Sequence, residues 1–156
     1  MTKKILSLVA MALLFVACEK SKNDDPEMPA PPSFEEVTDF TAYGLVSVPS
    51  QEFTMDNVRA EAKLKEGNVM DIYLYDVSFS SRMPVTISLV IPDVSYIRTE
   101  EQITFAGNDI VPTVRNVPFP DYTVTDLQGT VTPDELALSC SFGGIPCTYQ
   151  GAITTE

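Results

Sequence analysis

The sequence contains no histidine and no tryptophan, and no lysine follows Lys65. Without histidine there is no Ser-His-Asp or Cys-His nucleophile, no imidazole base and no His-containing zinc or iron site. A Ser-Lys pair in the folded part would depend on Lys63 or Lys65, and no serine stands near either lysine at a recognisable spacing. We therefore expect a protein that is not an enzyme, with no catalytic residues, no metal ligands and no cofactor.

Positive charge is also scarce. The chain has ten Lys and Arg residues and 22 Asp and Glu residues, which gives a formal net charge of −12. Such a surface repels phosphate backbones and anionic lipid heads, so nucleic acid is not an expected partner. Acid pairs such as Asp71 with Asp76 follow from the acidic composition, and their spacing does not indicate glycosidase geometry.

The chain has no hydrophobic run long enough for a permanent membrane helix. Lys3 and Lys4 precede the apolar stretch Ile5–Ala17, which has 13 residues, whereas a spanning helix needs about 20. This pattern is typical of a secretory signal peptide, predicted over residues 1–17. Ordinary signal cleavage favours a small residue where Phe15 stands, three positions before Cys18.

A lone cysteine follows this stretch directly. The segment Leu14–Cys18 resembles a bacterial lipobox, with Phe15 in the place of the usual leucine. The resemblance implies that Cys18 carries lipid, becomes the first mature residue and makes the membrane a partner through a lipid anchor. Each buried methylene of an acyl chain contributes about 0.8 kcal/mol, so several chains hold a protein firmly. The alternative is a chance cysteine beside an ordinary signal.

Residues 18–33 are rich in acids and prolines and cannot bury enough apolar surface to fold, so we predict an extended tether. Within it, Ser21–Asp25 resembles the acidic export signal of Bacteroidetes surface lipoproteins. That resemblance implies an outer-membrane lipoprotein exposed at the cell surface. If the stretch is only a solvated linker, the domain faces the periplasm instead.

The folded region reads as strands. In Val58–Lys65, apolar and charged residues alternate, the period of a strand with one dry face. Glu66–Asn68 supplies a turn, and Val69–Phe79 completes a hairpin. Val85–Ile91 alternates in the same way, and Pro92 is expected to end that strand. Further candidate strands are 40–48, 94–98, 103–106, 110–114, 122–131, 136–142 and 148–154. With no sustained helical period, the pattern predicts an all-β sandwich or barrel.

Two cysteines flank a predicted hairpin. A two-residue turn at Gly143 and Gly144 places Cys140 directly opposite Cys147. In an exported protein this predicts a disulfide, because opposed Cα atoms lie about 5.5 Å apart. The alternatives are two buried thiols or a redox pair, and no Cys-x-x-Cys motif or neighbouring base favours the latter.

Several motifs carry a family resemblance: Tyr43–Leu45, Asp76–Val94, Pro118–Val131 and Cys147–Ile153. In their order of turn glycines and prolines they resemble the calycin-like β-barrel lipoproteins of Bacteroidetes. This implies an antiparallel, lipocalin-like barrel of about eight strands in residues 34–156. Gly44 and Gly151 would lie on the first and last strands, which pair to close it. A lipocalin Gly-x-Trp signature is absent, since the chain has no tryptophan.

The sequence is compatible with two functions. One is a binding module that holds a small apolar ligand in the lumen. Its candidate ligand-binding residues face inward: Val58, Ala60, Ala62, Leu64, Ile72, Leu74, Ile87 and Leu89. The other is a non-catalytic surface accessory protein with a side-chain-filled barrel that binds a protein or a glycan. Its candidate exposed aromatics are Tyr73, Tyr75, Tyr96, Phe119 and Tyr122.

Overall fold

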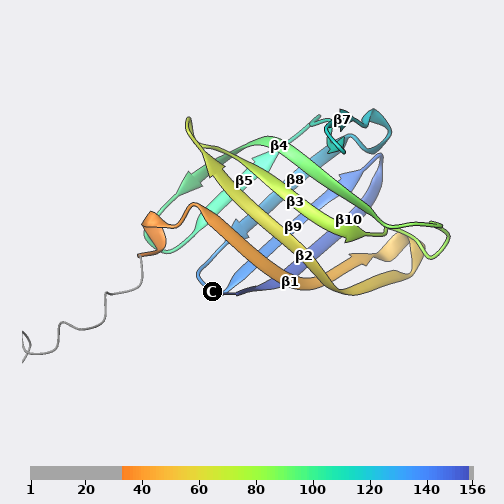
Figure 1. Cartoon of the computed structure of the whole chain (residues 1–156), viewed down its shortest axis with the longest axis horizontal. Coiled ribbons are helices and arrows are strands. Elements are labelled where there is room, and N and C mark those ends of the chain that lie inside the picture. The colour runs from red at the N-terminus through yellow and green to blue at the C-terminus, as the bar shows by residue number, and fades with distance from the viewer. Residues whose placement is uncertain (1–32, 155–156) are drawn as a thin grey trace, which may run out of the picture. The chain divides into compact units, whose positions relative to one another are not determined.

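Residues 33–154 form a β-barrel in the computed structural model (Figure 1). The predicted signal peptide, Cys18 and most of the predicted tether lie outside these described residues. The strands are β1 (Asp39–Val48), β2 (Phe53–Lys65), β3 (Val69–Val77), β4 (Ile87–Arg98), β5 (Ile103–Gly107), β6 (Thr113–Val114), β7 (Val117–Pro118), β8 (Val124–Val131), β9 (Glu135–Phe142) and β10 (Ile145–Thr154). Three single 3₁₀ turns are η1 (Phe34–Glu36), η2 (Pro49–Gln51) and η3 (Pro120–Tyr122).

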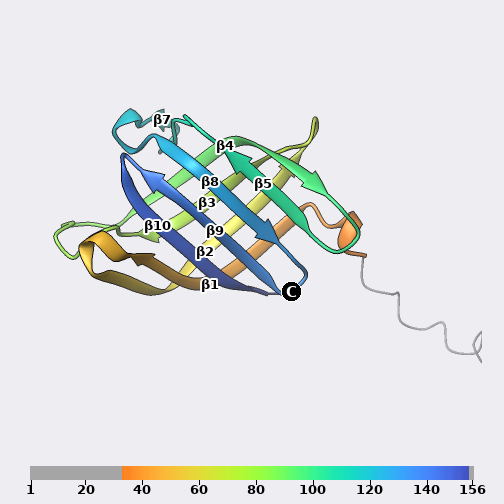
Figure 2. The same ribbon diagram turned by 180° about the vertical axis from the view of Figure 1, so that it is seen from behind.

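Eight strands close the barrel, all antiparallel. Their order around it is β1, β2, β3, β4, β5, β8, β9 and β10, and β10 pairs with β1. The small hairpin β6–β7 is attached to β4. Strands β1 to β4 lie in front in Figure 1, and β5, β8, β9 and β10 lie in front in Figure 2. Because the sheet closes on itself, the eight strands leave no long free edge. The all-β barrel prediction is confirmed.

The closing seam depends on two glycines. The first and last strands pair, as the resemblance implies, and Gly44 of β1 lies directly opposite Gly151 of β10. A Cβ atom at Gly44 would lie 2.0 Å from the carbonyl oxygen of Gln150. The first and last strands therefore approach more closely than side chains at this pair would allow.

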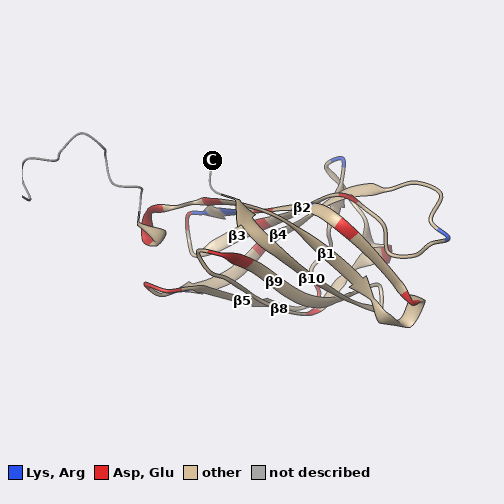
Figure 3. Cartoon of the chain, turned by 90° about the horizontal axis from the view of Figure 1, so that it is seen from below, with Lys and Arg blue, Asp and Glu red and all other residues tan. Residues whose placement is uncertain are grey.

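Alternation along the strands decides what lies inside. In β9, for example, Leu136, Leu138, Cys140 and Phe142 are buried, and the residues between them are more exposed. The same period recurs in β1, β3 and β10. Inward side chains from all eight barrel strands meet in one apolar cluster that fills the barrel. Acidic residues, red in Figure 3, far outnumber basic ones along the ribbon.

Four register shifts interrupt the ladders, and each has a left-handed Asn or Asp residue beside it. The residues are Asn57 in β2, Asp76 in β3, Asp93 in β4 and Asp126 in β8, with φ between 49° and 58°. Asn and Asp tolerate this conformation better than most residues, and such shifts are β-bulges. At three of them a neighbouring side chain accepts a hydrogen bond from the bulge N–H. Ser88 bonds to Asp76, Asp71 to Asp93 and Asn108 to Asp126, at 3.0 to 3.1 Å.

The prediction that Pro92 ends a strand is wrong. Strand β4 runs through it to Arg98 and joins two predicted strands into one. Pro92 lies at the bulge of Asp93, where the register shifts and one residue is left out of the ladder, so a proline costs little. The predicted strand at 110–114 is also mostly absent: only β6 and an isolated bridge from Ile110 to Val124 form there.

The segment before β1 is held to the end of β4. An Arg98 Nη2 atom donates hydrogen bonds to the carbonyl oxygens of Phe34 and Val37, the latter at 2.7 Å. The guanidinium carbon lies 5.3 Å from the centre of the Phe34 ring. Within residues 33–154, no helix is both long and apolar enough to cross a bilayer.

Candidate functional site

The predicted ligand-binding residues of the lumen do point inward. Val58, Ala60, Ala62, Ile72, Leu74 and Leu89 are each at most 2% exposed, while Leu64 and Ile87 are partly buried against the same cluster. Ala60 lies opposite Leu74, and Ala62 lies opposite Ile72. Each small alanine is thus matched by a large neighbour. The structure brings the eight residues together as parts of a packed core.

Aromatic side chains close both ends of the barrel. At one end the rings of Phe34 and Phe40 lie 5.5 Å apart. At the other end the Phe79 ring packs 4.8 Å from Phe142 and 5.7 Å from Tyr122. Phe34, Phe79 and Tyr122 come from segments outside the strands, so these segments act as plugs.

A tyrosine crosses the interior next to the closing seam. Tyr149 is 1% exposed, and its hydroxyl donates a hydrogen bond of 2.9 Å to the carbonyl oxygen of Val58, across β1 on strand β2. Gly151 leaves space for this ring, because a Cβ atom there would lie 2.4 Å from the hydroxyl oxygen. Burial raises the pKa of Tyr149, so the hydroxyl stays protonated as a donor.

The two hairpin cysteines are opposed as the sequence predicts, with Cys140 across from Cys147. Both point into the core and are recorded as free thiols, which matches the buried-thiol alternative; the disulfide stays a prediction. Burial raises the pKa of Cys147 to about 12 and that of Cys140 further. Neither thiol has the thiolate character that redox chemistry requires.

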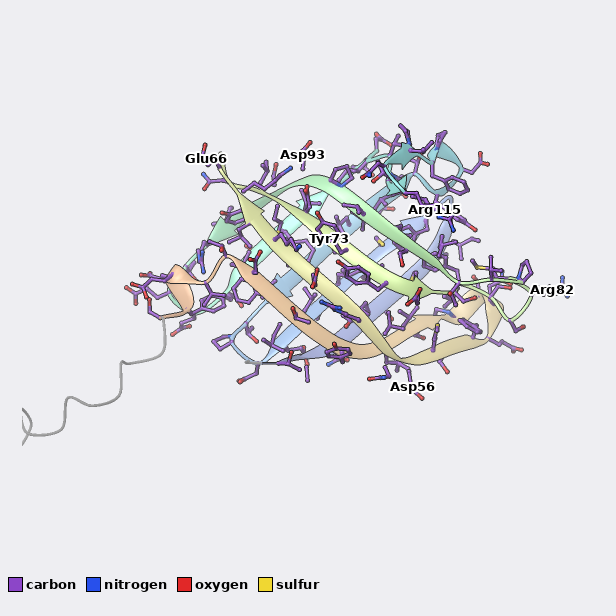
Figure 4. The ribbon with its side chains drawn as sticks, viewed as in Figure 1. Asp56, Glu66, Tyr73, Arg82, Asp93 and Arg115 are labelled. Carbon is purple, nitrogen blue, oxygen red and sulfur yellow. The ribbon has the colours of Figure 1, made fainter. Side chains whose placement is uncertain are left out.

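One outer face carries a network of tyrosines and ions. On β2 and β3, Glu61 accepts hydrogen bonds from Arg59 at 2.5 Å and from the Tyr75 hydroxyl at 2.7 Å. Lys63 lies 3.7 Å from the same carboxylate and 5.0 Å from the Tyr73 ring centre. Tyr73 and Tyr75 stack at 6.1 Å, and Figure 4 shows Tyr73 on the front of the barrel. These partners cover Glu61 and leave its side chain about 10% exposed.

Two pKa shifts follow from this network. Burial opposes ionisation of Glu61, but hydrogen bonds from Tyr75 and Arg59 and the charges of Arg59 and Lys63 outweigh it, so the pKa of Glu61 lies below its usual value. Burial, followed by the hydrogen bond to Glu61, raises the pKa of Tyr75 to about 12. The Glu61 carboxylate is thus satisfied within the network by one hydroxyl donor and two cationic side chains.

The opposite outer face is hollowed. An open groove of about 1060 Å³ lies on β5, β8, β9 and β10, the face toward the viewer in Figure 2. The side chains in it that alternate with buried neighbours are Thr104, Ala106, Gln128, Thr130, Ala137, Ser139, Thr148 and Gln150. We call this set the polar groove. Its side chains are neutral, and all except Gln128 and Gln150 are short, whereas the face of β2 and β3 carries charged and aromatic side chains.

The register orders the polar groove into two rows across the four strands. Ala106, Gln128, Ser139 and Thr148 are successive cross-strand partners. Thr104, Thr130, Ala137 and Gln150 form the second row in the same way. This site is not predictable from the sequence, because the rows bring together residues up to 46 positions apart that carry no recognisable motif.

The predicted exposed aromatics separate into different environments. Tyr73 and Tyr75 belong to the ionic network, and Tyr122 and Phe119 pack against each other at 5.0 Å beside the plugged end. Tyr96 is partly buried against the core. These five residues therefore do not form one aromatic patch.

Comparison of the chain with protein-family models, with curated proteins and with solved structures finds no match. The closed eight-stranded antiparallel barrel is nevertheless consistent with a calycin-like fold.

Proposed function

We propose that this chain is a non-catalytic surface accessory protein whose barrel interior is structural and whose outer surface binds a partner. The observation that carries the proposal is the filled interior: inward side chains of every barrel strand pack together, and aromatic plugs cover both ends. A lumen site for a small apolar molecule needs an enclosed space of about 300 Å³ or more. Two hollows among the described residues, the groove on β5, β8, β9 and β10 and a smaller one on β4 and β5, are open and lie on the outer surface.

Thermal unfolding tests this proposal against lumen binding. The chain is mixed with fatty acids, bile acids and hydrophobic dyes, and its melting temperature is measured. We expect no shift, because a ligand that does not bind the native state cannot stabilise it. A concentration-dependent rise of several degrees with any of these compounds would instead support the lumen-binding hypothesis.

We further propose that the protein is a lipid-anchored outer-membrane lipoprotein of the Bacteroidetes type, exposed at the surface. Support comes from the segment Leu14–Cys18 and the acidic stretch that follows it. Metabolic labelling of bacteria with an alkyne fatty acid should mark the protein, and Cys18→Ser should remove the label. Protease treatment of intact cells then separates the two orientations, since only a surface-exposed domain is degraded.

A further inference from the structure

We propose that the polar groove binds a neutral oligosaccharide chain, a proposal that rests on the outer-surface recognition proposed above. The first support is the groove's chemistry. Sixteen of the described residues line the open groove that contains these eight side chains, and among them only Asp126 carries a charge, although charged residues make up 21% of the chain. Hydroxyl and carboxamide groups both donate and accept hydrogen bonds, which is the pairing that sugar hydroxyls require.

The second support is geometry. The two rows cross four strands, and neighbouring strands lie about 4.8 Å apart. This step is close to the length that one pyranose ring adds to an extended glycan. Each row combines one alanine with hydroxyl and carboxamide side chains, so it offers a sugar both apolar surface for its C–H faces and partners for its hydroxyls.

The third support is the rigidity of the surface. Most groove side chains are short and stand on paired strands, so little rotamer freedom is lost on binding. One of the two long side chains, Gln150, is already oriented by a hydrogen bond of 2.9 Å from its Nε2 to Glu135. Beneath the groove, Phe105 packs against Gly129, where a Cβ atom would lie 2.2 Å from the ring. At Gly129 the groove floor is therefore backbone over a packed aromatic ring.

Other ligand classes fit this groove less well. An anionic polymer would be repelled by a chain of net charge −12. A cationic partner would find more carboxylates elsewhere on the surface than the single one here. An apolar molecule would leave the hydroxyls and amides without partners. An added peptide strand needs a free sheet edge, and the barrel strands that carry the groove are paired on both sides.

Affinity electrophoresis of the unlipidated Cys18→Ser chain tests the proposal. Native gels contain a soluble α-glucan, a mixed-linkage β-glucan, a galactomannan, a xylan or, as the anionic polymer, polygalacturonate. We expect at least one neutral polysaccharide, and not polygalacturonate, to retard the protein. In that gel, Gln128→Ala/Gln150→Ala should weaken the apparent Kd at least tenfold, because both amides are exposed groove groups.

The matched control is Tyr43→Ala/Arg59→Ala on the opposite outer face, which should bind as the parent does. Melting temperatures confirm that both double variants are folded. Failure of every neutral polysaccharide to retard the protein would overturn the proposal, and so would unchanged binding by the groove variant. Loss of binding only in the Tyr43/Arg59 variant would also overturn it, yet would leave outer-surface recognition standing. Lumen binding in the thermal test, by contrast, would refute the proposed function itself.

Discussion

At the scale of single residues, the hydroxyl of Tyr149 ties the closing strand to β2 through the core. We expect Tyr149→Phe to lower the free energy of unfolding by about 1–2 kcal/mol, because the buried Val58 carbonyl loses a donor. Urea unfolding measures the change. Tyr43→Phe is the control. Because Tyr43 is 40% exposed, this substitution should lower the free energy of unfolding by no more than about 0.5 kcal/mol. Equal losses in the two variants would contradict the role of this hydrogen bond.

Glu61 makes stability depend on pH. Its pKa is lower in the folded chain than the ordinary 4.5, so its contribution is fully present above that value and is lost as the pH falls through the folded pKa. At pH 7, Glu61→Gln should cost on the order of 1 kcal/mol, since the bonds from Arg59 and Tyr75 lose their charge assistance. When urea unfolding is measured from pH 7 to pH 3, the free energies of unfolding of the parent chain and of Glu61→Gln should converge below about pH 4.5. A difference in free energy of unfolding that does not change with pH would show that the charge of Glu61 does not contribute to stability.

At the scale of strands, alternation and turns were predictable but bulges were not. Val58–Lys65 and the Gly143–Gly144 turn predicted a strand, its inward face and the Cys140–Cys147 register. The aspartates at the bulges are not distinguishable in the sequence from ordinary solvated charges, because nothing in the residues around Asp76 marks it as a bulge position. The effect of Pro92 was mispredicted for the same reason, because a proline is tolerated there only through the register shift between β4 and β3.

The bulges give a direct test of backbone conformation. Asp76 has φ 49° and is exposed, so Asp76→Val should cost about 1–2 kcal/mol through the left-handed conformation alone. Asp76→Gly should cost much less, because glycine adopts this region freely. Urea unfolding compares the two variants. If glycine and valine destabilise equally, the side chain of Asp76 and not its backbone is what matters.

The β9–β10 hairpin carries the two core cysteines, Cys140 and Cys147, opposite each other. In the Cys18→Ser chain we expect no reaction with DTNB in native buffer and two equivalents in urea, because burial raises both thiol pKa values and blocks access. Reaction in native buffer would contradict the burial. If neither cysteine reacts with DTNB in urea without reductant, the two form the disulfide that the opposed register permits.

At the scale of the whole molecule, the sequence predicted a closed barrel but not whether its lumen was open. Small inward residues such as Ala60 and Ala62 allowed either outcome, because their partners were set by the register between β2 and β3. The polar groove was hidden for a related reason: it exists only once β5, β8, β9 and β10 lie side by side. Closure was implied only by the family resemblance, and the structure gives its physical basis, since Gly44 and Gly151 lie opposite each other where the end strands meet.

Xenon under pressure measures the barrel interior most directly, because it occupies empty apolar cavities in protein crystals. Crystals of the Cys18→Ser chain should show no ordered xenon among the inward side chains, whereas Ile72→Ala, which empties space in the core, should bind xenon there and lose about 2–5 kcal/mol of stability. A xenon atom in the unaltered barrel, surrounded by residues such as Leu74 and Leu89, would contradict the filled interior and return the lumen to consideration as a ligand site.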